Sequence, residues 1–130
     1  MALDGEIVID SSSALCFLLR ERGWEAFPDF VPTGIMSVIN YAEVVQRLLR
    51  DDADAEMRAG ALVVAGLRLI DVDLDVALGA ARLEGATRKQ GISLGDRICL
   101  ALGIDRRLPV LTADKPWKDL GLPVEIRLLR

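Results

Sequence analysis

Short apolar runs alternate along the chain with segments whose apolar residues recur at helical spacing. Most of the runs are rich in Val, Ile or Leu and stop at polar or turn-forming residues, which predicts strands. The predicted strands span residues 6–9, 33–36, 67–72, 109–112 and 124–128. The predicted helices span residues 12–20, 37–50, 55–65, 74–89 and 93–106. Strands that alternate with helices indicate an α/β fold whose parallel sheet is covered on both faces.

Several element boundaries carry local signals. The expected helix N-caps are Ser37, Asp73 and Ser93. The expected helix ends are marked by Gly66 and Gly91. The apolar face predicted for the helix at residues 37–50 consists of Val38, Ala42, Val45 and Leu49. A glycine and two prolines interrupt residues 21–32, which predicts only a short helix near Trp24 and Phe27. Residues 115–123 are expected to form a turn-like segment.

Composition agrees with a folded protein and limits its class. The chain has 130 residues, 52% of them hydrophobic and 5% aromatic, so we expect one domain (residues 1–130) with an aliphatic core. No apolar run is long enough and sufficiently free of charge to span a bilayer, and the N-terminus lacks a signal-peptide pattern. We therefore expect a cytoplasmic protein without a membrane partner.

Cysteine and histidine usage narrows the possible chemistry. Cys16 and Cys99 both lie within apolar helical patterns and are too few for a zinc site, so buried free thiols are expected. The chain contains no histidine. Histidine-based triads, histidine-ligated zinc and histidine acid–base catalysis are therefore excluded.

The charge balance is acidic, with 16 basic and 20 acidic residues and a net charge of −4. Proteins that bind nucleic acids usually have a basic surface, so the total counts against an RNA or DNA partner. An acidic total also arises when carboxylates are gathered to bind a cation. The positions of the acids therefore matter more than their sum.

Four acids stand where chemistry is expected, and each has an ordinary structural alternative. They are Asp10, Glu43, Asp96 and Asp114. Asp10 follows the first strand and could simply be an N-cap, and Glu43 could be a solvated helix residue. Asp96 has the spacing of a capping box with Ser93, and Asp114 could belong to a turn.

Taken together, the four acids favour a shared site. Asp10 and Asp114 follow strands, while Glu43 and Asp96 lie early in helices that can reach the same sheet edge. Gathered carboxylates repel one another unless a cation compensates, and Mg²⁺ or Mn²⁺ prefers such oxygen ligands. A bound ion of this kind can activate water and neutralise charge on a phosphoryl group. The pattern therefore suggests metal-dependent hydrolysis of phosphodiesters.

Four further residues are candidates for supporting roles. Ser12 and Thr112 each lie two residues from an acid and could orient a carboxylate or a metal-bound water. Helix capping by Ser12 and packing of Thr112 at a strand end are equally good explanations. Arg97 and Lys115 adjoin Asp96 and Asp114 and are the basic residues best placed to contact an RNA phosphate.

Four motifs, in order, resemble those of the PIN domain, and most closely the VapC-type toxins of bacterial toxin–antitoxin pairs. The motifs are Ile7-Val8-Ile9-Asp10-Ser11-Ser12, Asn40-Tyr41-Ala42-Glu43-Val44, Ser93-Leu94-Gly95-Asp96-Arg97-Ile98-Cys99-Leu100-Ala101 and Val110-Leu111-Thr112-Ala113-Asp114. The resemblance implies a three-layer α/β/α sandwich with a mostly parallel five-stranded sheet. It also implies a Mg²⁺- or Mn²⁺-dependent endoribonuclease that forms a homodimer and is inhibited by a small antitoxin.

The same resemblance assigns roles to individual residues. It implies an acidic catalytic site formed by Asp10, Glu43, Asp96 and Asp114, with Ser12 and Thr112 in support. The metal ligands would be Asp10, Asp96 and Asp114. All four acids are present in the matching motifs, so the resemblance gives no indication of an inactive enzyme.

Three other functions fit parts of the sequence. A Mg²⁺-dependent phosphatase with an aspartate nucleophile on the first strand usually has a second acid two residues later, where this chain has Ser12. A phospho-acceptor receiver domain would need adjacent acids after that strand, but Ile9 and Ser11 flank Asp10. A PIN-like binding module without metal or nuclease activity is the non-enzymatic alternative.

Overall fold

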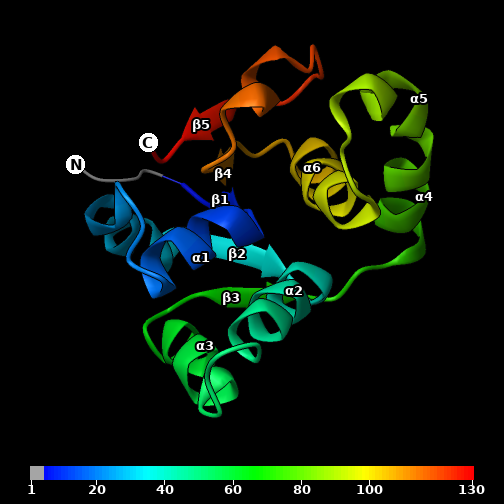
Figure 1. The fold of residues 1–130 in the computed structure, drawn as a ribbon. Helices are drawn as coiled ribbons and strands as arrows, with labels where there is room; N and C mark the ends of the chain where they lie inside the picture. Colours follow the sequence, from blue (N-terminus) through cyan, green and yellow to red (C-terminus); the bar gives the residue numbers. More distant parts are fainter. Residues whose placement is uncertain (1–4) are drawn as a thin grey trace.

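A five-stranded sheet forms the centre of the computed structural model, which describes residues 5–130 (Figure 1). Its strands are β1 (Ile7–Ile9), β2 (Gly34–Ser37), β3 (Arg68–Ile70), β4 (Val110–Thr112) and β5 (Ile126–Leu128). The strand order is β3-β2-β1-β4-β5, and every neighbouring pair is parallel. The prediction of an α/β fold with a five-stranded sheet is confirmed, and the sheet is parallel throughout. The chain runs from β1 outward through β2 to β3 and then returns to β4 on the other side of β1, so the switch point lies between β1 and β4.

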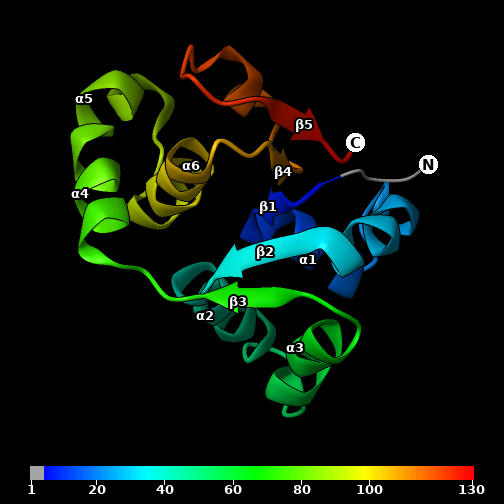
Figure 2. The same cartoon turned by 180° about the vertical axis from the view of Figure 1, so that it is seen from behind.

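Helices cover both faces of the sheet and complete a three-layer α/β/α arrangement (Figures 1 and 2). The α-helices are α1 (Ser11–Leu18), α2 (Val38–Leu48), α3 (Ala55–Val64), α4 (Leu74–Arg82), α5 (Glu84–Thr87) and α6 (Leu94–Arg106). The 3₁₀ segments are η1 (Trp24–Thr33), η2 (Arg88–Gln90) and η3 (Lys115–Asp119). Helices α1, α2 and α3 pack on one face together with η1, whereas α4 and α6 pack on the other.

The alternation of side chains along the strands explains the two cores. Ile7 and Ile9 belong to the core beneath α1, α2 and α3, whereas Val8 between them belongs to the core beneath α4 and α6. All three side chains are fully buried. A strand covered on both faces needs apolar residues at successive positions, and the Ile-Val-Ile run meets that need. The strand is thereby fixed in register, and so is Asp10, the residue that follows it.

One face of α2 differs from the prediction. The structure buries Asn40, Val44 and Leu48, whereas Leu49, expected in the core, is 56% exposed. The prediction assigned only apolar residues to the inner face of the helix. The predicted face is therefore offset from the observed one by about one residue. Asn40 is buried because its carboxamide is fully hydrogen-bonded, as described below.

The long helix predicted for residues 74–89 is also interrupted. Leu83 ends α4 and precedes α5, and the chain continues as the 3₁₀ segment η2 before Gly91. Gly85 weakens a continuous helix at this point, because glycine is a poor helix former. The hydroxyl of Thr87 donates to the carbonyl of Leu83 at 2.8 Å and stabilises the shorter turn.

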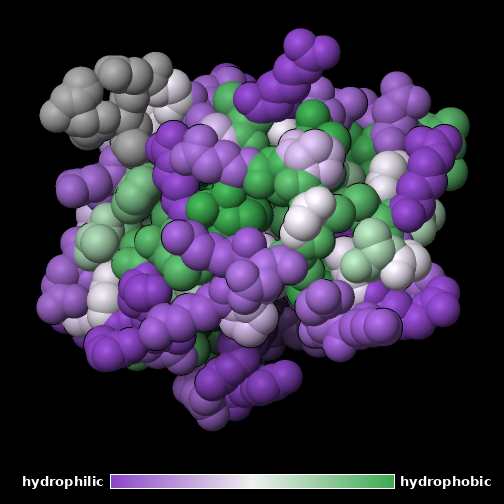
Figure 3. Space-filling view, turned by 90° about the horizontal axis from the view of Figure 1, so that it is seen from above, coloured by the Kyte–Doolittle hydropathy of each residue, from purple (hydrophilic) through white to green (hydrophobic). Residues whose placement is uncertain are grey.

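The surface contains both polar and apolar regions. On the face drawn in Figure 3, hydrophilic residues surround a central group of hydrophobic ones. Within residues 5–130, no helix is both long and apolar enough to cross a membrane. Cys16 and Cys99 are free and buried, as expected, and burial raises the pKa of the Cys99 thiol well above its usual value.

Candidate active site

Two of the predicted acids meet at the switch point of the sheet. Asp10 directly follows β1, and Asp114 lies two residues after the end of β4. These strands are hydrogen-bonded neighbours, with Val8 opposite Val110 and Ile9 opposite Leu111. Because the strands are parallel, their carboxyl ends lie at one edge, as the sequence led us to expect.

Asp10 is buried, with 1% of its surface exposed, and its two carboxylate oxygens have different surroundings. Oδ2 accepts hydrogen bonds from the hydroxyls of Ser12 and Thr112 at 2.5 and 2.9 Å. It also accepts from the Ser12 amide at 3.3 Å, which makes Asp10 the N-cap of α1. Oδ1 is buried without a hydrogen-bond partner. Capping and the two hydroxyls therefore occupy one oxygen and leave the other without a partner.

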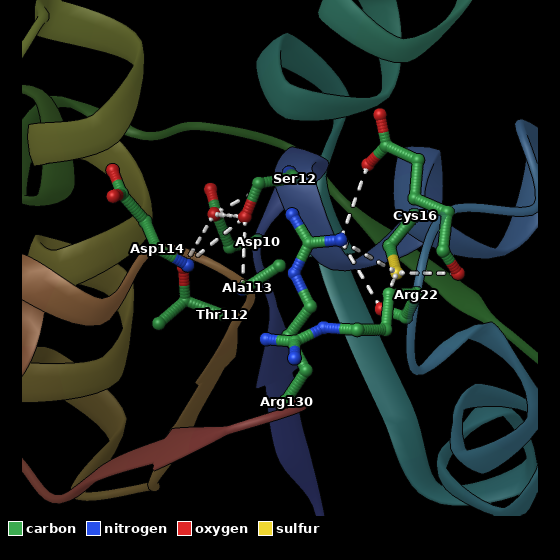
Figure 4. Close-up of polar contacts among 9 residues, drawn as sticks. Asp10, Ser12, Cys16, Arg22, Thr112, Ala113, Asp114 and Arg130 are labelled. Atoms are coloured by element: carbon green, nitrogen blue, oxygen red, sulfur yellow. Dashed lines mark hydrogen bonds and ion pairs between the residues drawn. The ribbon is translucent and has the colours of Figure 1, made fainter.

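The hydroxyls of Ser12 and Thr112 connect Asp10 to the loop that carries Asp114 (Figure 4). The Ser12 hydroxyl oxygen accepts from the Ala113 amide at 3.0 Å, and the Thr112 hydroxyl oxygen accepts from the Asp114 amide at 3.0 Å. The two hydroxyl oxygens lie 3.1 Å apart. The residues predicted to support the site thus contact Asp10 and fix the backbone beside Asp114.

Helices α2 and α6 contribute the other two acids. Glu43 Oε1 accepts from the Asn40 carboxamide at 2.9 Å and from the Ser11 hydroxyl at 3.3 Å. Asp96 forms the expected capping box with Ser93: its carboxylate accepts from the Ser93 amide, and its amide donates to the Ser93 hydroxyl. Both acids therefore have structural roles in addition to their proximity to the site.

The pKa values show that the acids influence one another. Burial raises the pKa of Asp10 from 3.8 to about 7; hydrogen bonds from Ser12 and Thr112 oppose this rise, and the charge of Asp96 adds to it. Burial also raises the pKa of Asp96, hydrogen bonds from Ser93 lower it, and the charges of Glu43 and Asp114 raise it. Asp96 thus interacts with each of the other three acids.

The carboxylates of the four acids are suitable ligands for a hard cation, although their present side-chain positions do not surround one. All four groups offer carboxylate oxygens, which Mg²⁺ and Mn²⁺ prefer, and the free Oδ1 of Asp10 lacks a partner. Across residues 5–130, no group of three or more acidic or cysteine side chains is positioned to hold a metal ion. Binding of an ion by several of these acids would therefore require rotation of their side chains.

The two basic residues predicted near the acids occupy different positions. Arg97 is partly buried on α6, and its Nε donates to the Ser93 carbonyl at 3.3 Å. Lys115 is exposed at the start of η3, directly after Asp114. Lys115 is therefore the more accessible of the two to a ligand.

Asn40 and Gly95 join α2 to α6, and neither residue was predicted to belong to the site. The Asn40 carboxamide donates to Glu43 and, at 2.9 Å, to the carbonyl of Gly95, while its oxygen accepts from the Ser37 hydroxyl at 2.6 Å. A Cβ on Gly95 would lie 2.8 Å from Cδ of Glu43, so only glycine permits this approach. One signal in the sequence could have identified Asn40: it is a polar residue about one turn before Glu43, on the helix face that also carries the apolar Val44 and Leu48.

Replacing Asn40 with alanine is expected to lower the free energy of unfolding by about 2 kcal/mol, because Ser37, Glu43 and Gly95 each lose one hydrogen bond at a buried or partly buried position. Chemical denaturation of the wild type and the variant measures the change. The matched control is Gln46→Ala, an exposed residue of the same helix, for which we expect a change within about 0.5 kcal/mol. Equal losses in the two variants would contradict this role of Asn40.

Comparisons with known proteins agree with this geometry. A toxin–antitoxin complex from Klebsiella pneumoniae is 21% identical with a TM-score of 0.69, over 93% of this chain and 100% of the other. VapC20 from Mycobacterium tuberculosis, described as a sarcin–ricin loop cleaving toxin, is 19% identical with a TM-score of 0.71, over 92% and 99% of the two chains. VapBC-5 from the same organism is 24% identical with a TM-score of 0.64, over 97% and 98%.

The structural likeness shows a shared fold. Comparison of the sequence with curated proteins gave no significant match. The profile of the PIN domain family matches residues 7–122, a range that contains all four acids and four of the five strands. The chain belongs to the PIN domain family.

Proposed function

We propose that this PIN domain protein is a Mg²⁺- or Mn²⁺-dependent endoribonuclease and acts as the toxin of a toxin–antitoxin pair. The observation that carries the proposal is the buried, unpartnered Oδ1 of Asp10 close to other acids: burial, and the charge of Asp96, raise the pKa of Asp10. An oxygen without a partner in a group of mutually repelling carboxylates is stabilised by a cation. Membership of the PIN domain family and the toxins among the structural relatives support the same function.

In this proposal Asp10, Asp96 and Asp114 hold the ion, and Glu43 completes the acidic site. A bound divalent ion would polarise the scissile phosphodiester and lower the pKa of a coordinated water. The hydroxyls of Ser12 and Thr112 keep Asp10 oriented by binding Oδ2, which leaves Oδ1 without a partner. Asn40 orients Glu43 through the hydrogen bond to Oε1. These fixed contacts reduce the reorganisation needed when substrate binds.

The proposed partners follow from the relatives. The Klebsiella pneumoniae structure is a toxin–antitoxin complex, so we propose a small antitoxin protein that inhibits this chain. We also propose a homodimer that acts in the cytoplasm, where cellular RNA is available. Expression of the chain should arrest bacterial growth, and co-expression of a small protein encoded in the adjacent reading frame should restore it.

Removal of divalent metal is expected to stop RNA cleavage. Purified protein is incubated with RNA in Mn²⁺, in EDTA, and in EDTA followed by excess Mn²⁺, and the fragments are resolved by gel electrophoresis. Cleavage should fall to background in EDTA and return with Mn²⁺, because the acids cannot supply the Lewis acid themselves. The proposal is wrong if cleavage in EDTA equals cleavage in Mn²⁺.

A further inference from the structure

A cavity of about 280 Å³ adjoins the acidic site and has a different charge character. It is lined by Ser12 and Asp114 from that site, by Leu15, Leu19 and Glu21, by Ala113, and by two arginines, Arg47 and Arg130. We propose that this cavity is a subsite that binds a phosphate flanking the scissile bond of the RNA. The inference rests on the proposed function and names residues that hold its substrate.

The two guanidinium groups come from segments that lie far apart in the sequence. Arg47 lies in the last turn of α2, and Arg130 follows β5. The Arg130 guanidinium donates to the carbonyl of Arg22 at 3.1 Å and to the sulfur of Cys16 at 3.7 Å. Figure 4 shows Arg130 between these groups and the residues around Asp10. The side chain is thus held in place beside the acidic site.

Both arginines keep donors available for an anion. Arg130 lies 3.7 Å from the carboxylate of Glu21, and Arg47 lies 3.5 Å from that of Asp51. The Arg130 and Arg47 side chains are 29% and 35% exposed. Ion pairs this long and this exposed contribute little, and each guanidinium has five N–H donors. A phosphate can therefore take up donors that the present contacts leave free.

The cavity's other walls fit a nucleotide. Leu15 of α1 and Leu19, the C-cap of that helix, provide an apolar side, against which a ribose or base can pack. Ser12 and Asp114 make the cavity continuous with the acidic site, so a strand cut at Asp10 would have a neighbouring phosphate close to the arginines. Planar guanidinium groups bind phosphate oxygens in a bidentate manner. The two guanidinium groups offset the charges of Glu21 and Asp114 in the lining, so this cavity is less acidic than the neighbouring site around Asp10.

Binding of RNA tests the subsite separately from cleavage. The background is Asp10→Asn, which is expected not to cut, and the probe is a short fluorescein-labelled single-stranded oligoribonucleotide followed by anisotropy. Arg47→Gln and Arg130→Gln should each raise Kd about tenfold. Each should also reduce the salt dependence of log K by about 0.7. The matched control is Arg106→Gln, which removes the same charge about 15 Å further along α6 from Asp96 and should leave Kd unchanged.

The outcomes separate the two proposals. If Arg47→Gln binds RNA as tightly as Arg106→Gln and with the same salt dependence, the subsite is refuted, even where the wild type cuts RNA. If the wild type cuts no RNA in Mn²⁺, the nuclease proposal fails; weaker binding by Arg47→Gln would then still show that the cavity holds an RNA phosphate, but not one that flanks a scissile bond. Arg130 also contacts Arg22, so thermal melting of its variant is measured in parallel. Arg47→Gln, which breaks only a long surface ion pair, carries the test independently of stability.

Discussion

Asp10→Asn is expected to reduce the rate of RNA cleavage by about 10³-fold or more, the scale on which loss of one electrostatic catalytic group acts. Asparagine has the size of aspartate and is an equally good N-cap, so α1 should keep its start. The substitution removes the negative charge from the position of the free Oδ1. Single-turnover cleavage of RNA in saturating Mn²⁺ measures the effect. Asp96→Asn is expected to cause a comparable loss, since Asp96 interacts with all the other acids.

The control for this experiment is Asp105→Asn. Asp105 is exposed near the end of α6, whereas Asp96 lies in its first turn, and the substitution changes the net charge by the same amount. Cleavage by the control should match the wild type. If Asp10→Asn cuts RNA at the rate of Asp105→Asn, Asp10 has no part in the reaction and the four-acid site must be abandoned.

In the metal-free protein, the free energy of unfolding is expected to fall as the pH rises from about 4 to about 7. Burial raises the pKa of Asp10 from 3.8 to about 7 in the folded state. Between these values the folded state binds the proton and the unfolded state does not, so increasing pH favours unfolding. The difference corresponds to about 4 kcal/mol. Asp96, whose pKa is also raised, adds a change of the same sign.

Urea denaturation in EDTA at pH 4, 5.5 and 7.5 measures this dependence for the wild type and for Asp10→Asn. Asparagine has no proton to lose at this position. The free energy of unfolding of the variant should therefore be close to that of the wild type at pH 4 and exceed it by more as the pH rises. Comparison of the two proteins cancels contributions from ion pairs elsewhere in the structure, such as Arg58–Asp52 and Arg88–Glu84. If the free energy of unfolding changes with pH in the same way for both proteins, burial does not raise the pKa of Asp10. The same experiment therefore measures how much the buried Asp10 carboxylate lowers the free energy of unfolding, independently of RNA cleavage.

Local signals were sufficient to predict much of the fold. The Ile-Val-Ile run before Asp10 predicted a buried strand and a helix start, and both occur. The spacing of Ser93 and Asp96 predicted a capping box, and its two hydrogen bonds are present. These features depend on residues within a few positions of one another. Patterns of alternating strands and helices then sufficed for a parallel sheet, because few topologies satisfy right-handed crossovers.

Contacts between distant segments were not predictable in this way. The inner face of α2 was placed incorrectly because the burial of Asn40 depends on the Gly95 carbonyl, which lies 55 residues away. The role of Arg130 depends on a contact with Arg22 across 108 residues, and neither arginine stood out in the sequence. Grouping of the four acids was inferred from the topology. Their hydrogen bonds and the unpartnered Oδ1 of Asp10 could not be predicted from the sequence and are seen only in the structure.

The close approach of α6 to α2 at Gly95 also limits how this protein can be redesigned. Any side chain at position 95 would displace the carboxylate of Glu43, and alanine is already too large. The adjacent Leu94 is 55% exposed and has no such constraint. A library of surface variants beside the acidic residues should therefore vary position 94 and keep glycine at 95. Residue 94 can then change while the close contact between Gly95 and Glu43 stays intact.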